Sequence, residues 1–119
     1  APPSVTAALN LLAELDGRRI AVLGDMYELG SFAERGHRMV GARAAEVADL
    51  LVTVGPMARW IADEARYAGL SERFIFPYET NAEAIDKLRS LIKSDEIVLI
   101  KGSRGMQMEE IVSALEEFE

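Results

Sequence analysis

The sequence predicts an α/β fold, namely a three-layer α/β/α Rossmann-like domain with a mainly parallel sheet. Four short aliphatic runs, of the kind found in strands buried on both faces, occur at residues 20–23, 50–54, 74–76 and 97–100. A segment with helical periodicity follows each run, another precedes the first, and the turns between them are short. Strands that alternate with helices in this way form parallel sheets through right-handed crossovers, so we expect helices on both faces.

The first two helices are predicted from apolar spacing and from capping residues. Ser4 is expected to cap a helix that stops at Asp16 and Gly17. Ser31 and Glu34 match a capping box at the start of the second helix. The inner faces are expected to carry Val5, Ala8, Leu9 and Leu12 in the first helix, and Val40, Ala44 and Val47 in the second.

The last three helices are predicted in the same way. Pro56 suits the first position of the third helix, which is expected to end near Gly69. Thr80 and Glu83 form another capping box before the fourth helix. The expected inner-face residues are Ile61, Ala62 and Ala65, then Ile85, Leu88, Leu91 and Ile92, and finally Met108, Ile111, Val112 and Leu115, with Met106 also in the core.

The composition fits one globular domain and excludes several classes of protein. Of its 119 residues 50% are hydrophobic and 28% are charged, which is ordinary for a folded domain. The chain is too short for two domains. The net charge of -7 repels nucleic acid and anionic lipid, so we expect neither as a partner, and an anionic ligand must be captured locally. With no cysteine and one histidine, the chain has no disulfide framework and no multi-histidine or cysteine metal site. No apolar run approaches the roughly 20 residues of a membrane span and the start is not a signal peptide, so a cytoplasmic location is expected.

Polar residues directly follow the first strand, where an open parallel sheet binds ligands. Asp25 comes first after residues 20–23, and its carboxylate can accept hydrogen bonds from ribose hydroxyls or hold a metal-bound water. The alternative is that Asp25 caps the turn that follows it. Glu28 either belongs to the same site or lies in solvent and helps to cap the helix near Ser31.

A cationic loop follows the fourth strand. Lys101, Ser103 and Arg104 place two cations and a hydroxyl just before a helix. Such a loop suits a carboxylate or phosphate, because lysine supplies a point charge and arginine a planar fork. The alternative is a solvated loop whose cations pair with Glu109 and Glu110. The acidity of the whole chain favours the binding interpretation.

Three further side chains are interpreted as structural. His37 is expected at the surface or partly packed, rather than as a catalyst. Trp60 and Tyr67 lie seven residues apart on one predicted helix and are expected to pack rather than to stack on a base. No catalytic residue and no metal ligand is assigned.

Several nucleotide-enzyme motifs are missing. The chain has no G-x-x-x-x-G-K-[ST] phosphate loop and no complete G-x-G-x-x-G after the first strand, which argues against a dinucleotide dehydrogenase. A receiver-like signalling module is disfavoured, because the first strand offers only Asp25 where a cluster of acids is needed.

The order of these motifs resembles the C-terminal domain of the Mur ligases over nearly the whole chain. The resemblance rests on P-S-V at residues 3–5, A-A-L at 7–9, V-L-G-D-M-Y-E-L-G at 22–30, His37, V-L-I-K-G-S-R-G-M at 98–106, and Glu109. The combination of G-D-M-x-E-L-G and K-G-S-R in this order is specific.

The resemblance implies that residues 1–119 are the last domain of a longer, three-domain, ATP-dependent amide ligase of peptidoglycan synthesis. The implied substrates are ATP with Mg²⁺, D-alanyl-D-alanine and UDP-N-acetylmuramoyl-tripeptide. By this resemblance Asp25 approaches the ATP ribose, while Lys101, Ser103 and Arg104 line the dipeptide pocket; Glu28 and His37 match motif positions. By the same resemblance the central domain holds most of the ATP and magnesium contacts, so the isolated C-terminal piece is expected to be inactive. The full-length enzyme is expected to be a monomer.

Three other functions use the same residues. A non-catalytic nucleotide- or peptide-binding module would bind its ligand tightly as a free domain. A sibling ligase of the folylpolyglutamate synthase type would keep the fold and Asp25 but lack the K-G-S-R loop. A purely structural domain would tolerate loss of Lys101 or Asp25.

Overall fold

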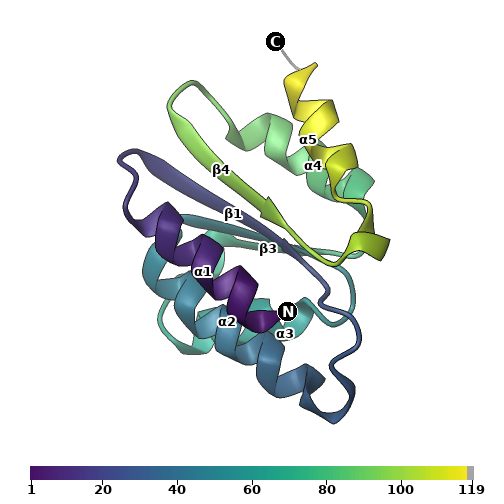
Figure 1. The fold of residues 1–119 in the computed structure, drawn as a ribbon. Coiled ribbons are helices and arrows are strands. Elements are labelled where there is room, and N and C mark those ends of the chain that lie inside the picture. The colour runs from purple at the N-terminus through teal and green to yellow at the C-terminus, as the bar shows by residue number, and fades with distance from the viewer. Residues whose placement is uncertain (118–119) are drawn as a thin grey trace.

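The computed structural model describes residues 1–117 and shows alternating strands and helices (Figure 1). No helix within this range is both long enough and apolar enough to cross a membrane. The strands are β1 (Arg18–Gly24), β2 (Leu50–Val54), β3 (Ile75–Tyr78) and β4 (Glu96–Lys101), and the α-helices are α1 (Pro2–Ala13), α2 (Ala33–Val47), α3 (Arg59–Tyr67), α4 (Asn81–Leu91) and α5 (Glu109–Glu116). Short 3₁₀ turns occupy Gly30–Phe32, Glu72–Phe74 and Arg104–Met106.

The four strands form one parallel sheet in the order β3-β2-β1-β4. Successive connections step from β1 to β2 to β3, and the chain then crosses to the other side of β1 to form β4. The strand order therefore reverses between β1 and β4. In open α/β sheets, ligands bind beyond the carboxyl ends of the two strands that flank this reversal.

Helices cover both faces of the sheet, which confirms the predicted three-layer architecture. Figure 1 shows α1, α2 and α3 on one side of the sheet and α4 and α5 on the other. The β1 side chains alternate between the two cores: Ala21 and Leu23 pack with the first group of helices, and Ile20 and Val22 with the second. The central strand is thus buried on both faces, as its continuous apolar run predicts.

Two predicted helix starts are wrong. Ser4 lies inside α1, which begins two residues earlier because Pro2 occupies the first turn, where its missing N–H costs nothing. Ser31 lies in the 3₁₀ turn that precedes α2, and no side chain caps α2. Glu34 instead pairs with Arg38 one turn along the helix, at 2.9 Å.

The capping box of α4 is confirmed, because the Thr80 hydroxyl accepts from the Glu83 N–H and the Glu83 carboxylate accepts from the Thr80 N–H. The third helix is shorter than predicted: Pro56 lies in a turn, and α3 begins at Arg59. Its predicted end holds, since the chain leaves α3 through Gly69 at φ +117°, a conformation that favours glycine.

Candidate functional site

The loops after β1 and β4 form one site, although the sequence separates them by about seventy residues. Leu23 lies opposite Lys101 in the parallel pair, so both loops leave the same edge of the sheet. The Ser103 N–H donates to the Asp25 carbonyl oxygen at 3.0 Å. The Tyr27 N–H donates to Ser103 Oγ at 2.7 Å. Ser103 therefore ties the two polar motifs together.

Two glycines allow this close approach. The Met108 side chain lies against both Gly24 and Gly102, and a Cβ on either glycine would overlap the Met108 sulfur. A Cβ on Gly102 would also lie 3.2 Å from Gly24 Cα. Met108 is buried and Met106 packs against the same core, so the prediction that both belong to the core is confirmed.

Asp25 is buried at the centre of the site, with 3% of its surface exposed. Its Oδ1 accepts from the Ala58 N–H at 2.6 Å, at the start of α3. The carboxylate therefore does not cap the turn that follows it in the chain, as one alternative proposed; it caps the helix that follows the neighbouring strand. Gly55 is required beside it, because a Cβ there would overlap the carboxylate.

The environment of Asp25 changes its acidity. Burial raises the pKa of Asp25 above its ordinary value of 3.8, and the hydrogen bond from the Ala58 N–H opposes that rise. The contact of Asp25 with an ATP ribose stays a prediction.

His37 is fully buried, so the prediction of a surface or partly packed side chain is wrong. Its Nε2 lies 2.9 Å from the Met26 nitrogen and its Nδ1 lies 2.7 Å from the Ala33 carbonyl oxygen. The Met26 N–H is a donor, so Nε2 accepts and Nδ1 carries the proton that the carbonyl receives. Both ring nitrogens are therefore occupied by the backbone.

The two aromatic side chains of α3 differ in their surroundings. Trp60 is half-buried and packs against the His37 ring, with centroids 5.9 Å apart. Tyr67 is 87% exposed, so the prediction that it packs is wrong. It is the last residue of α3.

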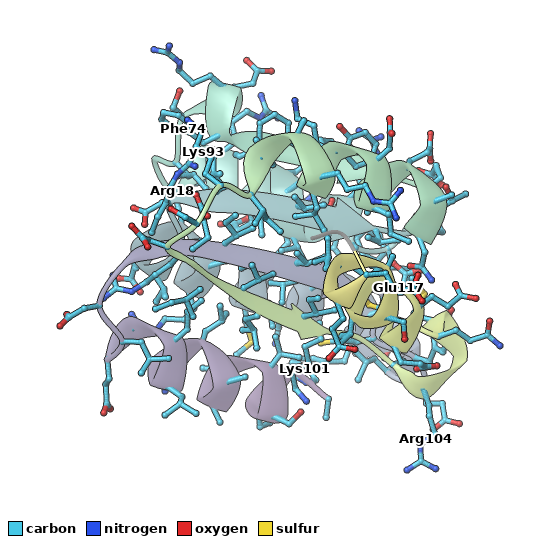
Figure 2. All side chains as sticks on the ribbon, turned by 90° about the horizontal axis from the view of Figure 1, so that it is seen from above. Arg18, Phe74, Lys93, Lys101, Arg104 and Glu117 are labelled. Atoms are coloured by element: carbon cyan, nitrogen blue, oxygen red, sulfur yellow. The ribbon has the colours of Figure 1, made fainter. Side chains whose placement is uncertain are left out.

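The cations of the site have no acidic partner within residues 1–117. Lys101 is half-buried at the end of β4, whereas Arg104 is exposed and projects away from the body of the domain (Figure 2). Neither forms an ion pair with Glu109 or Glu110 among the described residues, so the structure does not support the alternative of a self-paired basic loop. Glu110 instead accepts from the Asn81 side chain at 3.0 Å.

A shallow groove of about 440 Å³ lies over these loops, lined by Tyr27, Glu28, Leu29, Ser103, Arg104 and Gly105. The Tyr27 hydroxyl lies 2.9 Å from Met106 Sδ, which holds the ring against Gly105. Glu28 has φ +65°, a left-handed conformation that is uncommon for glutamate. No side-chain cap is formed at the 3₁₀ turn or at α2, and Glu28 lines the same groove as Arg104.

The acidic side chains of the site are those of Asp25 and Glu28. No group of three metal-ligating side chains occurs within the described residues 1–117. The Asp25 carboxylate is already bonded to the backbone, and Glu28 is a single exposed acid.

The sequence did not predict one set of hydrogen bonds that holds the loop after β4, namely those of Asn81. Asn81, at the start of α4, donates from Nδ2 to the Met106 carbonyl oxygen at 2.9 Å and to the Gln107 carbonyl oxygen at 3.3 Å. Gln107 has φ +52°, so this turn is left-handed without a glycine. An asparagine directly after a helix cap carries no signal of such a long-range contact.

Comparison with known proteins agrees with this fold. The family described as "Mur ligase, glutamate ligase domain" matches residues 1–104. The UDP-N-acetylmuramoyl-tripeptide–D-alanyl-D-alanine ligase of Escherichia coli is 39% identical over 118 residues, which are 96% of this chain and 24% of that protein. The Bacillus subtilis protein of the same name is 33% identical over 119 residues, or 98% of this chain and 26% of that one.

Solved structures give the same result. MurF from Acinetobacter baumannii superposes with a TM-score of 0.84 at 34% identity, over 98% of this chain and 26% of that chain. MurF from Thermotoga maritima, solved with ADP, has a TM-score of 0.80 at 23% identity and supports the fold, over 99% of this chain and 26% of that one. The chain thus spans about a quarter of the length of the curated relatives it matches.

The fold defines a three-layer α/β domain in which the polar loops after β1 and β4 meet at the carboxyl edge of the sheet. The chain belongs to the Mur ligase family, as its glutamate ligase domain.

Proposed function

We propose that this chain is the C-terminal domain of an ATP-dependent ligase that joins D-alanyl-D-alanine to UDP-N-acetylmuramoyl-tripeptide in peptidoglycan synthesis. The relatives of that name support the proposal. The observation that carries it is the loop after β4, where Lys101 and Arg104 lack an acidic partner within residues 1–117 and Ser103 is held in place by Tyr27. A fixed hydroxyl in a loop that carries two uncompensated cations suits a carboxylate ligand.

The carboxylate of the incoming dipeptide fits this loop chemically. Ser103 Oγ already accepts from the Tyr27 N–H, which leaves its own O–H free to donate to a ligand. Lys101 supplies a point charge at the strand end, and Arg104 supplies a planar fork at the rim of the groove. Together they orient the dipeptide so that its amine faces the reacting carbonyl.

The reaction of the intact enzyme divides between domains. ATP activates the tripeptide carboxylate as an acyl phosphate, the dipeptide amine attacks that carbonyl, and phosphate leaves as the amide forms. This domain closes over the central domain, which holds most of the ATP and Mg²⁺ contacts, with Asp25 beside the ribose. Closure excludes water from an intermediate prone to hydrolysis and positions the nucleophile.

The remaining properties follow from the same proposal. The enzyme acts in the cytoplasm and functions as a monomer. Nucleic acid and membrane are not partners, in accord with the net charge of -7.

The first experiment measures ligation by the full-length enzyme while D-alanyl-D-alanine and ATP are varied separately. Lys101→Ala is expected to raise the dipeptide KM about tenfold or more and to leave the ATP KM unchanged. This increase corresponds to the loss of a hydrogen bond to a charged group, which is worth about 1.5–3 kcal/mol. Lys93→Ala is the matched control, because Lys93 precedes the opposite end of β4 (Figure 2). A dipeptide KM equal to wild type in both variants contradicts the proposal.

A second experiment separates the ligase from a simple binding module. The isolated 119-residue chain is expected to hydrolyse no ATP and to bind D-alanyl-D-alanine weakly in calorimetry. Tight binding by the free chain supports the binding module instead, and Asp25→Ala with an unchanged ATP KM in the full-length enzyme removes the ribose assignment.

A further inference from the structure

The His37 ring joins helix α2 to the loop after β1. It is fully buried, and within residues 1–117 its nitrogens bond only to two backbone groups, the Met26 N–H and the Ala33 carbonyl. The half-buried Trp60 packs against the same ring and restricts its rotation. A ring enclosed in this way exchanges no proton with a ligand in the groove, so its role is not acid–base catalysis.

The residue that His37 holds is the centre of the cross-loop contact. Met26 lies between Asp25, whose carbonyl oxygen accepts from the Ser103 N–H, and Tyr27, whose N–H donates to Ser103 Oγ. Three consecutive backbone units are thus fixed by one buried imidazole and one serine. The Met26 side chain is itself 2% exposed, so this segment has little freedom to move.

A polar ring at this buried position has a specific physical reason. Helix α2 begins after the loop, so the Met26 N–H has no strand or helix partner and would be buried without an acceptor. An apolar side chain of similar size would leave that donor unpaired, and the loop would then rearrange to reach water.

We infer that His37, as its Nδ1–H tautomer, is a positioning residue that sets the Asp25–Tyr27 backbone and through it the placement of Ser103 in the dipeptide site. The effect on the dipeptide rests on the proposed function. The effect on the loop backbone does not.

The tautomer is the first test, and it needs no variant. His37 is the single histidine of the chain, so a long-range ¹H–¹⁵N spectrum of the uniformly labelled 119-residue protein gives an unambiguous assignment. The Nδ1–H form is expected at neutral pH. An Nε2–H form or an imidazolium overturns the inference, because neither can accept from the Met26 N–H.

Two variants then separate the acceptor from the volume of the ring. In His37→Gln the side-chain oxygen reaches about as far as Nε2 and keeps an acceptor, whereas His37→Leu keeps only the bulk. Val40→Ala, a buried change one turn further along α2, is the control for lost stability alone. Amide exchange at Met26, Tyr27 and Ser103 is expected to accelerate about tenfold or more in His37→Leu relative to Val40→Ala, and to be restored largely by His37→Gln.

In the full-length enzyme, His37→Leu is expected to raise the dipeptide KM about tenfold, with His37→Gln within about threefold of wild type. If His37→Leu and Val40→Ala change exchange and KM alike, His37 is merely structural and the inference is overturned. If Lys101→Ala leaves the dipeptide KM unchanged, the proposed function fails, while the tautomer and the exchange rates still decide the loop assignment.

Discussion

The contact between Asp25 and the start of α3 predicts a measurable loss of stability in Asp25→Ala. The substitution removes the acceptor of the buried Ala58 N–H, which forms a 2.6 Å hydrogen bond to the carboxylate. An unpaired buried donor costs about 1–3 kcal/mol. Because burial already disfavours the charged carboxylate, its removal offsets part of this cost, and we expect a net loss of about 1.5 kcal/mol.

The pH dependence of that loss has a definite sign. Burial raises the pKa of Asp25 above its ordinary value of 3.8, so the native state binds this proton more tightly than the unfolded state. The contribution of Asp25 to stability is therefore greatest below the ordinary pKa and falls as the pH rises through the raised pKa. The difference between wild type and Asp25→Ala is expected to be larger at about pH 3.5 than at about pH 7.

Urea unfolding of the 119-residue chain, followed by circular dichroism at both pH values, measures these differences. In thermal unfolding of the same chain, a loss of about 1.5 kcal/mol corresponds to a fall in Tm of about 6 °C. Asp63→Ala is the control on the same helix, because Asp63 is 43% exposed and pairs with Arg66 at 3.8 Å; it is expected to change stability by less than about 0.5 kcal/mol. A loss below about 0.5 kcal/mol in Asp25→Ala, or a difference that widens towards pH 7, refutes the reasoning.

Three further predictions concern stability and use the same unfolding assay. Gly102→Ala is expected to lower the free energy of unfolding by about 2 kcal/mol, because the added Cβ overlaps the Met108 sulfur. The control Ser113→Ala, at an exposed position, should change it by less than about 0.5 kcal/mol, and equal unfolding midpoints for the two variants would contradict the close approach of the loops. Thr80→Ala is expected to cost about 1 kcal/mol through loss of the α4 cap, and an unchanged midpoint would show that the cap is not formed in solution. Hydrogen bonds from the Thr80 hydroxyl and nearby N–H groups hold the pKa of Glu83 below its ordinary 4.5. The contribution of Glu83 to stability is therefore present above pH 4.5 and is lost as the pH falls through the lowered pKa. Glu83→Gln should flatten this part of the pH dependence of stability, and an unaltered profile would refute the assignment.

Most of the fold follows from local patterns in the sequence. Continuous apolar runs identified β1 and β2 because strands buried on both faces need no alternation; the half-buried edge strands β3 and β4 have short runs of the same kind. The order of strands and helices specified a parallel sheet. Capping was predicted less well. Thr80 and Glu83 form their box because Thr80 has the extended backbone of a cap, whereas Ser31 lies in a 3₁₀ turn that already continues into α2.

The site was predicted in position but not in detail. The rule for strand ends placed Asp25 and Ser103 at one edge, and the structure brings them into contact. The partners of buried polar groups were beyond reach, because Ala58 and Met26 offer backbone N–H groups that carry no signature in the sequence. The burial of His37 was missed for the same reason.

The pairing of β1 with β4 also constrains how the chain folds. Arg18 and Glu96, which bond across the start of these strands, are 78 residues apart, so this edge of β1 stays unpaired until residues 96–101 are present. During synthesis, residues 1–91 can form three strands whose apolar β1 edge has no partner, and such an edge favours aggregation. Because the two loops meet only when β4 pairs with β1, the candidate site is complete only after this long-range pairing has formed.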